Sequence, residues 1–97
     1  MTICRYYLMT AAEGQSEALR GALVALAAKV RPIAGCEGVE LYQDEKRPER
    51  LHFLEHWTSI DAHRAGGAAL GKEALAPVME LLAGPPEGAY IAPVPLG

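Results

Sequence analysis

The chain has 97 residues, of which 51% are hydrophobic, and its formal net charge at pH 7 is −3. A chain of this length forms one domain, spanning residues 1–97, and its apolar excess calls for a covering subunit or a ligand cavity. The charged residues are scattered and form no basic stripe, which argues against a nucleic-acid partner.

The sequence also shows no pattern typical of a membrane-spanning helix or of a signal peptide. No apolar run approaches the roughly 18–20 residues of a membrane span, and the start, MTICRYYLMT, lacks the layout of a signal peptide. We therefore expect a cytoplasmic protein without a membrane partner, in which Cys4 and Cys36 stay reduced. Two cysteines so far apart form no metal or redox motif and behave as small apolar residues.

The first half of the chain predicts a strand, a helix and a second strand. Ile3–Thr10 is rich in β-forming residues and contains no Gly or Pro. Apolar residues recur at three- and four-residue steps from Leu19 to Val30, which predicts an amphipathic helix. This helix ends at Arg31, because the residue before a proline avoids helical angles. The second strand is expected at Val39–Asp44.

The second half predicts a hairpin and then a broken helical region. A short charged link precedes a strand at Leu51–Thr58, so the second and third strands should pair antiparallel. Thr58 and Ser59 are typical of a helix start. We expect this helix to be interrupted near Gly66 and Gly67 and again at Gly71.

The last part of the chain predicts a further helical segment and an edge strand. Helix should resume over Lys72–Ala83, with either a kink at Pro77 or a helix start only shortly before it. Gly84 and the two prolines after it end the helix. A short strand at Ala89–Val94 should lie at a sheet edge, because its prolines limit pairing.

The element order β-α-β-β-α-β predicts the ferredoxin-like α+β fold, a four-stranded antiparallel sheet with two helices on one face. The other sheet face has no helix to cover it and would expose Tyr6, Leu8 and Leu54. Two such sheets packed face to face would bury these side chains. We therefore expect a homodimer.

The richest stretch for chemistry is Leu51–His63, LHFLEHWTSIDAH, which holds all three histidines, the one Trp and the one Phe. Strand alternation places Phe53, Glu55 and Trp57 on one face. If this face meets the helices, Phe53 and Trp57 wall a pocket into which Glu55 points. Apolar walls would raise the pKa of Glu55 and suit it to accept a proton. The alternatives are core packing for Trp57 and, for Glu55, an ion pair with Arg5 or a similar base.

Three further side chains are candidates for contact with a substrate. His63 lies about one helical turn past Ser59, near the expected pocket mouth, where an imidazole can deprotonate a phenol. The alternative is a histidine that faces solvent. Tyr7 and Tyr42 can donate hydrogen bonds to a substrate oxygen, the alternative being core tyrosines with satisfied hydroxyls.

The histidines do not predict a metal site. His52 and His56 share a strand face but lie roughly 13 Å apart, too far for one ion to bind both within a chain. No Gly-rich phosphate loop or flavin motif is present. We therefore expect neither metal nor bound cofactor, while a freely diffusing reduced flavin stays open as a co-substrate.

Two segments, PIAGCEGVEL at Pro32–Leu41 and LHFLEHWTS at Leu51–Ser59, resemble the antibiotic biosynthesis monooxygenase family of dimeric α+β barrels. The resemblance rests on a Gly-Cys turn before the second strand and on a Glu-x-Trp-x-Ser signature at the end of the third. It implies a pocket between sheet and helices. In some members it also implies cofactor-free oxidation of phenols, anthrones or quinols by dioxygen.

The resemblance also suggests roles for single residues. Anthrone-oxidising members line their site with a Tyr, an Asn, a Trp and a second Tyr. Tyr42 and Trp57 match two of these positions, whereas Phe53 stands at the Asn position and His63 at that of the second Tyr. Many relatives also carry a His in the second helix at the position that Gly66 holds here.

Haem degradation is disfavoured by the same comparison. The haem-degrading members carry an Asn in the first strand and a His in the second helix. Tyr7 and Gly67 occupy those places here.

The sequence therefore predicts a cofactor-independent monooxygenase that oxidises a small aromatic substrate, a phenol, quinol or anthrone, with dioxygen. The alternative is a non-catalytic dimeric barrel that binds a small apolar ligand as a stress or accessory protein, which the absent Asn and the exchanged His favour. The predicted catalytic residues are His63, Glu55 and Trp57, and the predicted substrate-binding residues are Tyr7, Tyr42 and Phe53.

Overall fold

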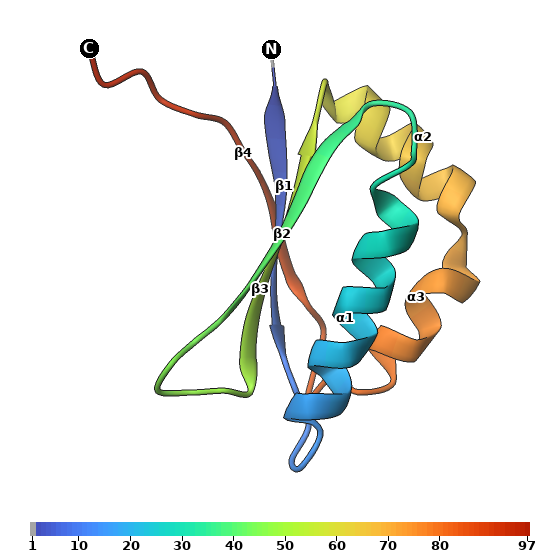
Figure 1. Ribbon diagram of the computed structural model, residues 1–97, viewed down its shortest axis with the longest axis vertical. Coiled ribbons are helices and arrows are strands. Elements are labelled where there is room, and N and C mark those ends of the chain that lie inside the picture. Colours follow the sequence, from blue (N-terminus) through green and yellow to red (C-terminus); the bar gives the residue numbers. More distant parts are fainter. Residues whose placement is uncertain (1) are drawn as a thin grey trace.

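The computed structural model describes residues 2–97, which form four strands and three helices. The strands are β1 (Ile3–Thr10), β2 (Cys36–Gln43), β3 (Arg50–Trp57) and β4 (Glu87–Ile91), and the helices are α1 (Ser16–Val30), α2 (Ile60–Leu70) and α3 (Lys72–Met79). The strands make one antiparallel sheet in the order β2-β3-β1-β4 (Figure 1). The predicted ferredoxin-like α+β fold is confirmed.

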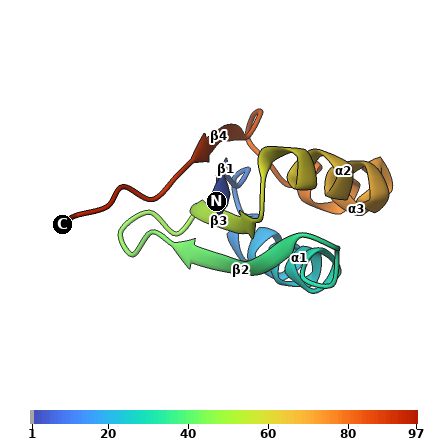
Figure 2. The ribbon, with the colours of Figure 1, turned by 90° about the horizontal axis from the view of Figure 1, so that it is seen from above.

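The helices lie together against one face of the sheet, and no helix within residues 2–97 covers the other face (Figure 2). The predicted apolar stripe of α1 is turned toward the sheet and buries Leu19, Leu23, Leu26 and Val30. Each fully buried Leu or Val contributes about 1.5–3 kcal/mol of transfer free energy. This stripe meets Met9, Leu51 and Phe53 of the sheet in one core.

The two central strands, β1 and β3, set the register of the whole sheet. Arg5 lies opposite Glu55 and Tyr7 lies opposite Phe53. The edge strand β4 places Tyr90 opposite Arg5 on the other side of β1. Paired residues in an antiparallel ladder point to the same face. Arg5, Glu55 and Tyr90 therefore form a row across the helix-covered face.

The turn before β2 packs against the end of β3 and the start of α2. Gly35 has φ 90°, a conformation that favours glycine. A Cβ at this position would lie 2.8 Å from the Cβ of Ala62. The backbone N–H of Thr58 donates to the carbonyl of Gly35 at 2.9 Å. The Gly-Cys turn thus fixes where α2 begins, and β2 starts earlier than predicted, at Cys36, with a bulge between Cys36 and Gly38.

The predicted interruption of the second helix near Gly66 and Gly67 is wrong, because α2 runs through both glycines to Leu70. The break occurs at Gly71 alone, where φ is 83°. Glycine within a helix costs only about 1 kcal/mol, which packing can offset. A positive φ at Gly71, by contrast, cannot continue a right-handed helix.

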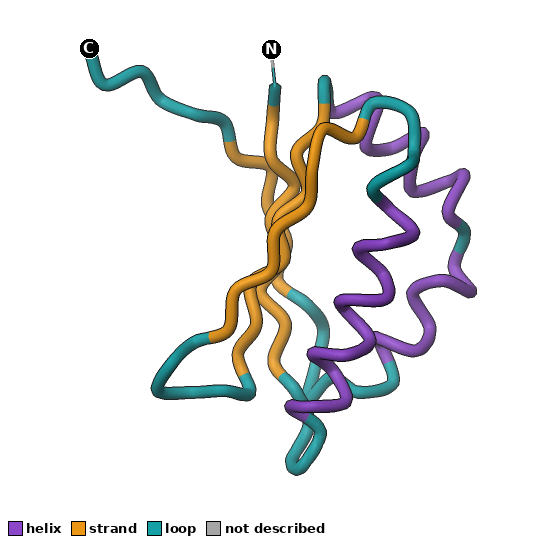
Figure 3. The backbone as a smooth tube through the Cα atoms, viewed as in Figure 1, coloured by secondary structure: helices purple, strands orange, loops and turns teal. Residues whose placement is uncertain are grey.

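The last elements also differ in length from the prediction. Helix α3 ends at Met79, four residues before Ala83, and Pro77 lies in its second turn. Strand β4 spans Glu87–Ile91, so it starts and stops earlier than predicted. Figure 3 shows the chain after Ile91 leaving the sheet as an extended tail. None of the helices described within residues 2–97 is both long and apolar enough to span a membrane.

Candidate functional site

Strand β3 presents its alternating side chains to the helices as predicted. Leu51, Phe53 and Trp57 are at most 1% exposed, and Glu55 is 6% exposed. Within residues 2–97, Glu55 is the one buried charged residue. A carboxylate beneath helices requires hydrogen-bond partners, because its desolvation is costly. The partners of Glu55 therefore define the candidate site.

Trp57 supplies the first partner. Its indole Nε1–H donates to Glu55 Oε1 at 2.9 Å. The far edge of the indole lies directly under α2, where a Cβ on Gly66 would come within 2.5 Å of Trp57 Cη2. The absence of a side chain at Gly66 thus allows the helix to close over the indole.

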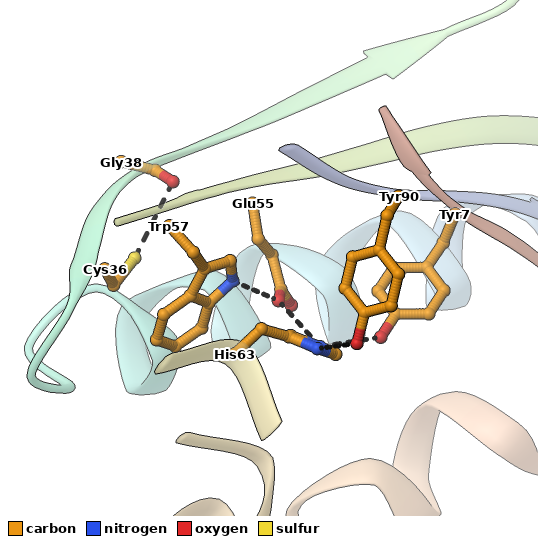
Figure 4. Close-up of polar contacts among 7 residues, drawn as sticks. All are labelled: Tyr7, Cys36, Gly38, Glu55, Trp57, His63 and Tyr90. Atoms are coloured by element: carbon orange, nitrogen blue, oxygen red, sulfur yellow. Dashed lines mark hydrogen bonds and ion pairs between the residues drawn. The ribbon is translucent and has the colours of Figure 1, made fainter. Parts of the chain in front are cut away.

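His63 lies close to Glu55 without hydrogen-bonding to it. Ser59 caps α2, its Oγ accepting from the backbone N–H of Ala62 at 3.0 Å, and His63 projects toward the sheet one turn later. Its Nε2 lies 3.3 Å from the hydroxyl of Tyr7 and 3.8 Å from Glu55 Oε1 (Figure 4). The interpretation of His63 as a solvent-facing residue is wrong, since its side chain is only 16% exposed.

Two residues that the sequence did not single out as site residues complete the cluster. Tyr90 brings its hydroxyl within 2.7 Å of His63 Nδ1. The Arg5 guanidinium carbon lies 4.8 Å from the ring centre of Tyr7 and 4.5 Å from that of Tyr90. Arg5 makes no ion pair with a carboxylate of residues 2–97, so the alternative of an Arg5–Glu55 ion pair is wrong.

Burial shifts the ionisable groups of the cluster toward their neutral forms. It raises the pKa of Glu55, against the opposing effects of the Trp57 hydrogen bond and the Arg5 charge. Burial also lowers the pKa of His63, and the charges of Arg5 and Arg64 lower it further. The Tyr7 pKa is raised, mainly by burial. His63 is therefore neutral at pH 7, and Glu55 is a carboxylate of enhanced basicity.

The cluster surrounds two small cavities between the sheet and the helices. One, of about 50 Å³, is bordered by Tyr7, Glu55, Trp57 and His63. The other, of about 80 Å³, is bordered by Phe53 and shares Tyr7, Glu55 and Leu75 with the first. Ligand pockets usually measure roughly 300–1,000 Å³. Both cavities are therefore smaller than a typical ligand pocket.

Tyr42 does not join the cluster. It pairs with His52 on the uncovered face, is 55% exposed, and donates its hydroxyl hydrogen to Glu40 Oε2 at 2.7 Å. Strand alternation is the reason, because its neighbour Leu41 occupies the helix-facing position. Five of the six predicted site residues thus come together, and Tyr42 is separated from them by the sheet.

The other two histidines also lie on the uncovered face. His52 Nδ1 is 2.7 Å from the hydroxyl of Tyr6, and His56 contacts Glu40. Within residues 2–97 no group of three or more His, Cys, Asp or Glu side chains is arranged to hold a metal ion.

Tyr90 could not be assigned from the sequence, because its place depends on the register of β4 against β1. The one signal in the sequence was that Arg5 and Tyr7, which are two residues apart in β1, share a strand face. That signal marks a polar row under the helices but does not identify the residue that completes it.

Comparison with known proteins supports one family. The sequence profile of the antibiotic biosynthesis monooxygenases matches residues 2–65. No curated protein matches the chain.

Many solved structures share the fold. A candidate antibiotic biosynthesis monooxygenase from Chloroflexus aurantiacus is 29% identical, with a TM-score of 0.80 over 98% of this chain and 95% of that one. A second from Bordetella bronchiseptica is 21% identical, with a TM-score of 0.84 over 96% and 97% of the two chains. A Pseudomonas aeruginosa protein is 25% identical, with a TM-score of 0.80 over 97% and 95%.

Proposed function

The chain belongs to the antibiotic biosynthesis monooxygenase family, and on that premise we propose that it oxidises a small aromatic substrate with dioxygen and no bound cofactor. The observation that carries this proposal is the buried cluster of Tyr7, Glu55, Trp57 and His63 around an internal cavity. The substrate is a phenol, a quinol or an anthrone, whose anion is electron-rich enough to reduce dioxygen.

The first step is removal of a substrate proton by the Glu55–His63 pair. The 3.8 Å between Glu55 Oε1 and His63 Nε2 leaves room for one substrate oxygen in hydrogen-bond contact with both groups. The raised pKa of Glu55 makes its carboxylate a stronger base than an exposed one. The pair gains the proton that the substrate loses.

The following steps need a dry site and correct placement of the ring. Phe53 and Trp57 form apolar walls at the cavities, and the hydroxyl of Tyr7 lies where it can contact a substrate oxygen. For an anthrone, the methylene group becomes a carbonyl. Dioxygen supplies that oxygen atom, and its second atom leaves as water with the two methylene hydrogens. Excluding bulk water protects the intermediate from side reactions.

The reaction is tested by incubating the purified protein in air with a panel of anthrones and quinols and following oxygen consumption. Uptake above the protein-free rate, lost in Trp57→Phe and His63→Ala variants, is the expected result. Removing one general acid–base group typically costs about 10²–10⁴-fold in rate. A His52→Gln variant, altered on the uncovered face, is the matched control and should keep the wild-type rate.

The alternative is a non-catalytic protein that binds a small apolar ligand against the apolar walls that Phe53 and Trp57 give the two cavities. The same experiment separates the two functions. Saturable binding of an aromatic ligand without oxygen consumption would favour this alternative and contradict the enzyme.

We propose in addition that the protein functions as a homodimer joined through the uncovered sheet face. That face carries Cys4, Leu54 and Ile91 around a surface depression of about 260 Å³. Its exposed apolar side chains include Tyr42 at 55% and Ile91 at 45%. A second copy can bury this area because the same face is present on both partners.

The dimer is tested by light scattering at micromolar concentration. We expect about twice the 10.4 kDa mass of one chain. A charged substitution at the centre of the face, Leu54→Glu, should shift the mass toward that of one chain. A wild-type mass near 10.4 kDa would contradict the dimer.

A further inference from the structure

Tyr90 makes a shorter polar contact with His63 than Tyr7 or Glu55 does, yet it has no part in the mechanism above. Its hydroxyl lies 2.7 Å from Nδ1, on the side of the ring away from Tyr7 and Glu55. Figure 4 shows the hydroxyls of Tyr90 and Tyr7 and the carboxylate of Glu55 gathered at the imidazole. In a neutral imidazole, one nitrogen donates and the other accepts. The partner of Nδ1 therefore decides what Nε2 presents to the cavity.

The Tyr7 hydroxyl, 3.3 Å from Nε2, can donate or accept, so the Glu55 carboxylate decides between the two forms, and it favours a proton on that nitrogen. The Glu55 carboxylate, 3.8 Å away, can only accept while it is ionised. A lone pair on Nε2 would be repelled by that carboxylate, whereas an N–H is attracted to it. With the proton on Nε2, the Nδ1 lone pair is free to accept from the hydroxyl of Tyr90.

Arg5 strengthens this arrangement from the other side. Its guanidinium carbon lies 4.5 Å from the centre of the Tyr90 ring. A guanidinium over an aromatic face is attracted to the ring, so Arg5 helps to hold the Tyr90 ring, and with it the hydroxyl, in place. Gly88 leaves the space that Arg5 occupies, since a Cβ there would lie 2.5 Å from Arg5 Nη2.

We propose that Tyr90 is a positioning residue that fixes the tautomer of His63, donating to Nδ1 so that the neutral ring carries its proton on Nε2. The assignment deepens the proposed function, on which it rests for the role of His63 in the reaction. This assignment gives Glu55 and His63 different roles in the reaction. Glu55 accepts the substrate proton, and His63 Nε2–H donates a hydrogen bond to the substrate oxygen as negative charge develops on it.

The hydrogen bond itself is tested by ¹⁵N NMR of the histidine side chains in the ligand-free protein, at a pH where His63 is neutral. In wild type we expect the Nε2 resonance of a protonated nitrogen and the Nδ1 resonance of a hydrogen-bonded acceptor. Tyr90→Phe should shift Nδ1 toward the position of an unbonded nitrogen and increase the population of the Nδ1–H tautomer.

A second variant guards against a fold defect in Tyr90→Phe. Gly88→Ala displaces the flexible end of Arg5 and retains the Tyr90 hydroxyl, so it should produce a smaller shift in the same direction. The chain also offers a matched control, because Tyr6 contacts His52 Nδ1 at the same 2.7 Å on the opposite face. Tyr6→Phe should change the His52 resonances and leave those of His63 unchanged.

A wild-type proton on Nδ1 of His63, or unchanged His63 resonances in Tyr90→Phe, would overturn the proposal. These readouts do not depend on catalysis. Failure to consume oxygen would remove the proposed function while leaving the Tyr90–His63 assignment in place. The reverse result, oxygen uptake with the wrong tautomer, would remove only the assignment.

Discussion

Replacing Glu55 with glutamine should reduce the rate of substrate oxidation by about 100-fold or more, because a buried general base is lost. The same change should raise the free energy of unfolding at pH 7. The glutamine carbonyl can still accept from Trp57 Nε1, which donates to Glu55 Oε1 at 2.9 Å, and no charge is then buried. Oxygen consumption and urea unfolding of both proteins measure the two effects.

The gain in stability should depend on pH in a defined direction. Burial raises the folded-state pKa of Glu55 above its unfolded value, so the folded protein binds this proton more tightly. Ionised Glu55 therefore costs stability above its folded pKa. That cost disappears below the unfolded pKa of about 4.3. The advantage of Glu55→Gln over wild type should shrink as pH falls through the folded-state pKa of Glu55 toward the unfolded value.

His63 acts in the opposite direction, because its folded-state pKa is lowered and its protonation at low pH opposes folding. The comparison of wild type with Glu55→Gln isolates the Glu55 contribution. Glu13→Gln, at an exposed position, is the control and should change neither activity nor stability. Full activity in Glu55→Gln, or a loss of stability at pH 7, would contradict the role assigned to Glu55.

Replacing Gly66 with alanine should destabilise the protein, although alanine is the better helix former by about 1 kcal/mol. The added Cβ would lie 2.5 Å from Trp57 Cη2, 2.8 Å from Cζ3 and 3.1 Å from Ile33 Cγ2. Trp57 is 1% exposed and is held at its other end by Glu55, so the indole cannot move aside freely. Overpacking of this kind costs about 1–3 kcal/mol.

The neighbouring glycine provides a matched control. A Cβ on Gly67 meets nothing within 4 Å. Gly67→Ala should therefore gain up to about 1 kcal/mol from helix propensity alone. Urea unfolding should move the two midpoints in opposite directions from wild type. Shifts of the same sign would contradict the contact of α2 with Trp57.

The fold could be predicted because its signals are local. The alternation in β3 put Phe53, Glu55 and Trp57 on one face, and the three- and four-residue spacing in α1 defined its buried stripe. Both patterns repeat over several residues, so a single exception does not change the result. Helix interruptions were harder to predict, because Gly66 and Gly67 are weak helix formers by themselves. Whether they break α2 depends on what packs beneath them.

The site was only partly predictable, because it depends on pairings between distant segments. The sequence could group Tyr7, Glu55, Trp57 and His63 through strand faces and one helical turn. It misplaced Tyr42, where family resemblance conflicted with alternation along β2. The chemical roles of Glu55 and His63 also depend on the folded chain. Burial beneath the helices raises the pKa of Glu55 and lowers the pKa of His63.

The most direct test of the central claim is the fate of dioxygen in a reaction catalysed by the purified protein without added cofactor. An anthrone or quinol that supports oxygen consumption is incubated under ¹⁸O₂ in ordinary water, and the mass of the product is measured by mass spectrometry. For an anthrone, we predict one ¹⁸O atom in the quinone product, formed at a rate that Glu55→Gln abolishes. An unlabelled product, or a rate equal in wild type and Glu55→Gln, would contradict oxygenation at this site.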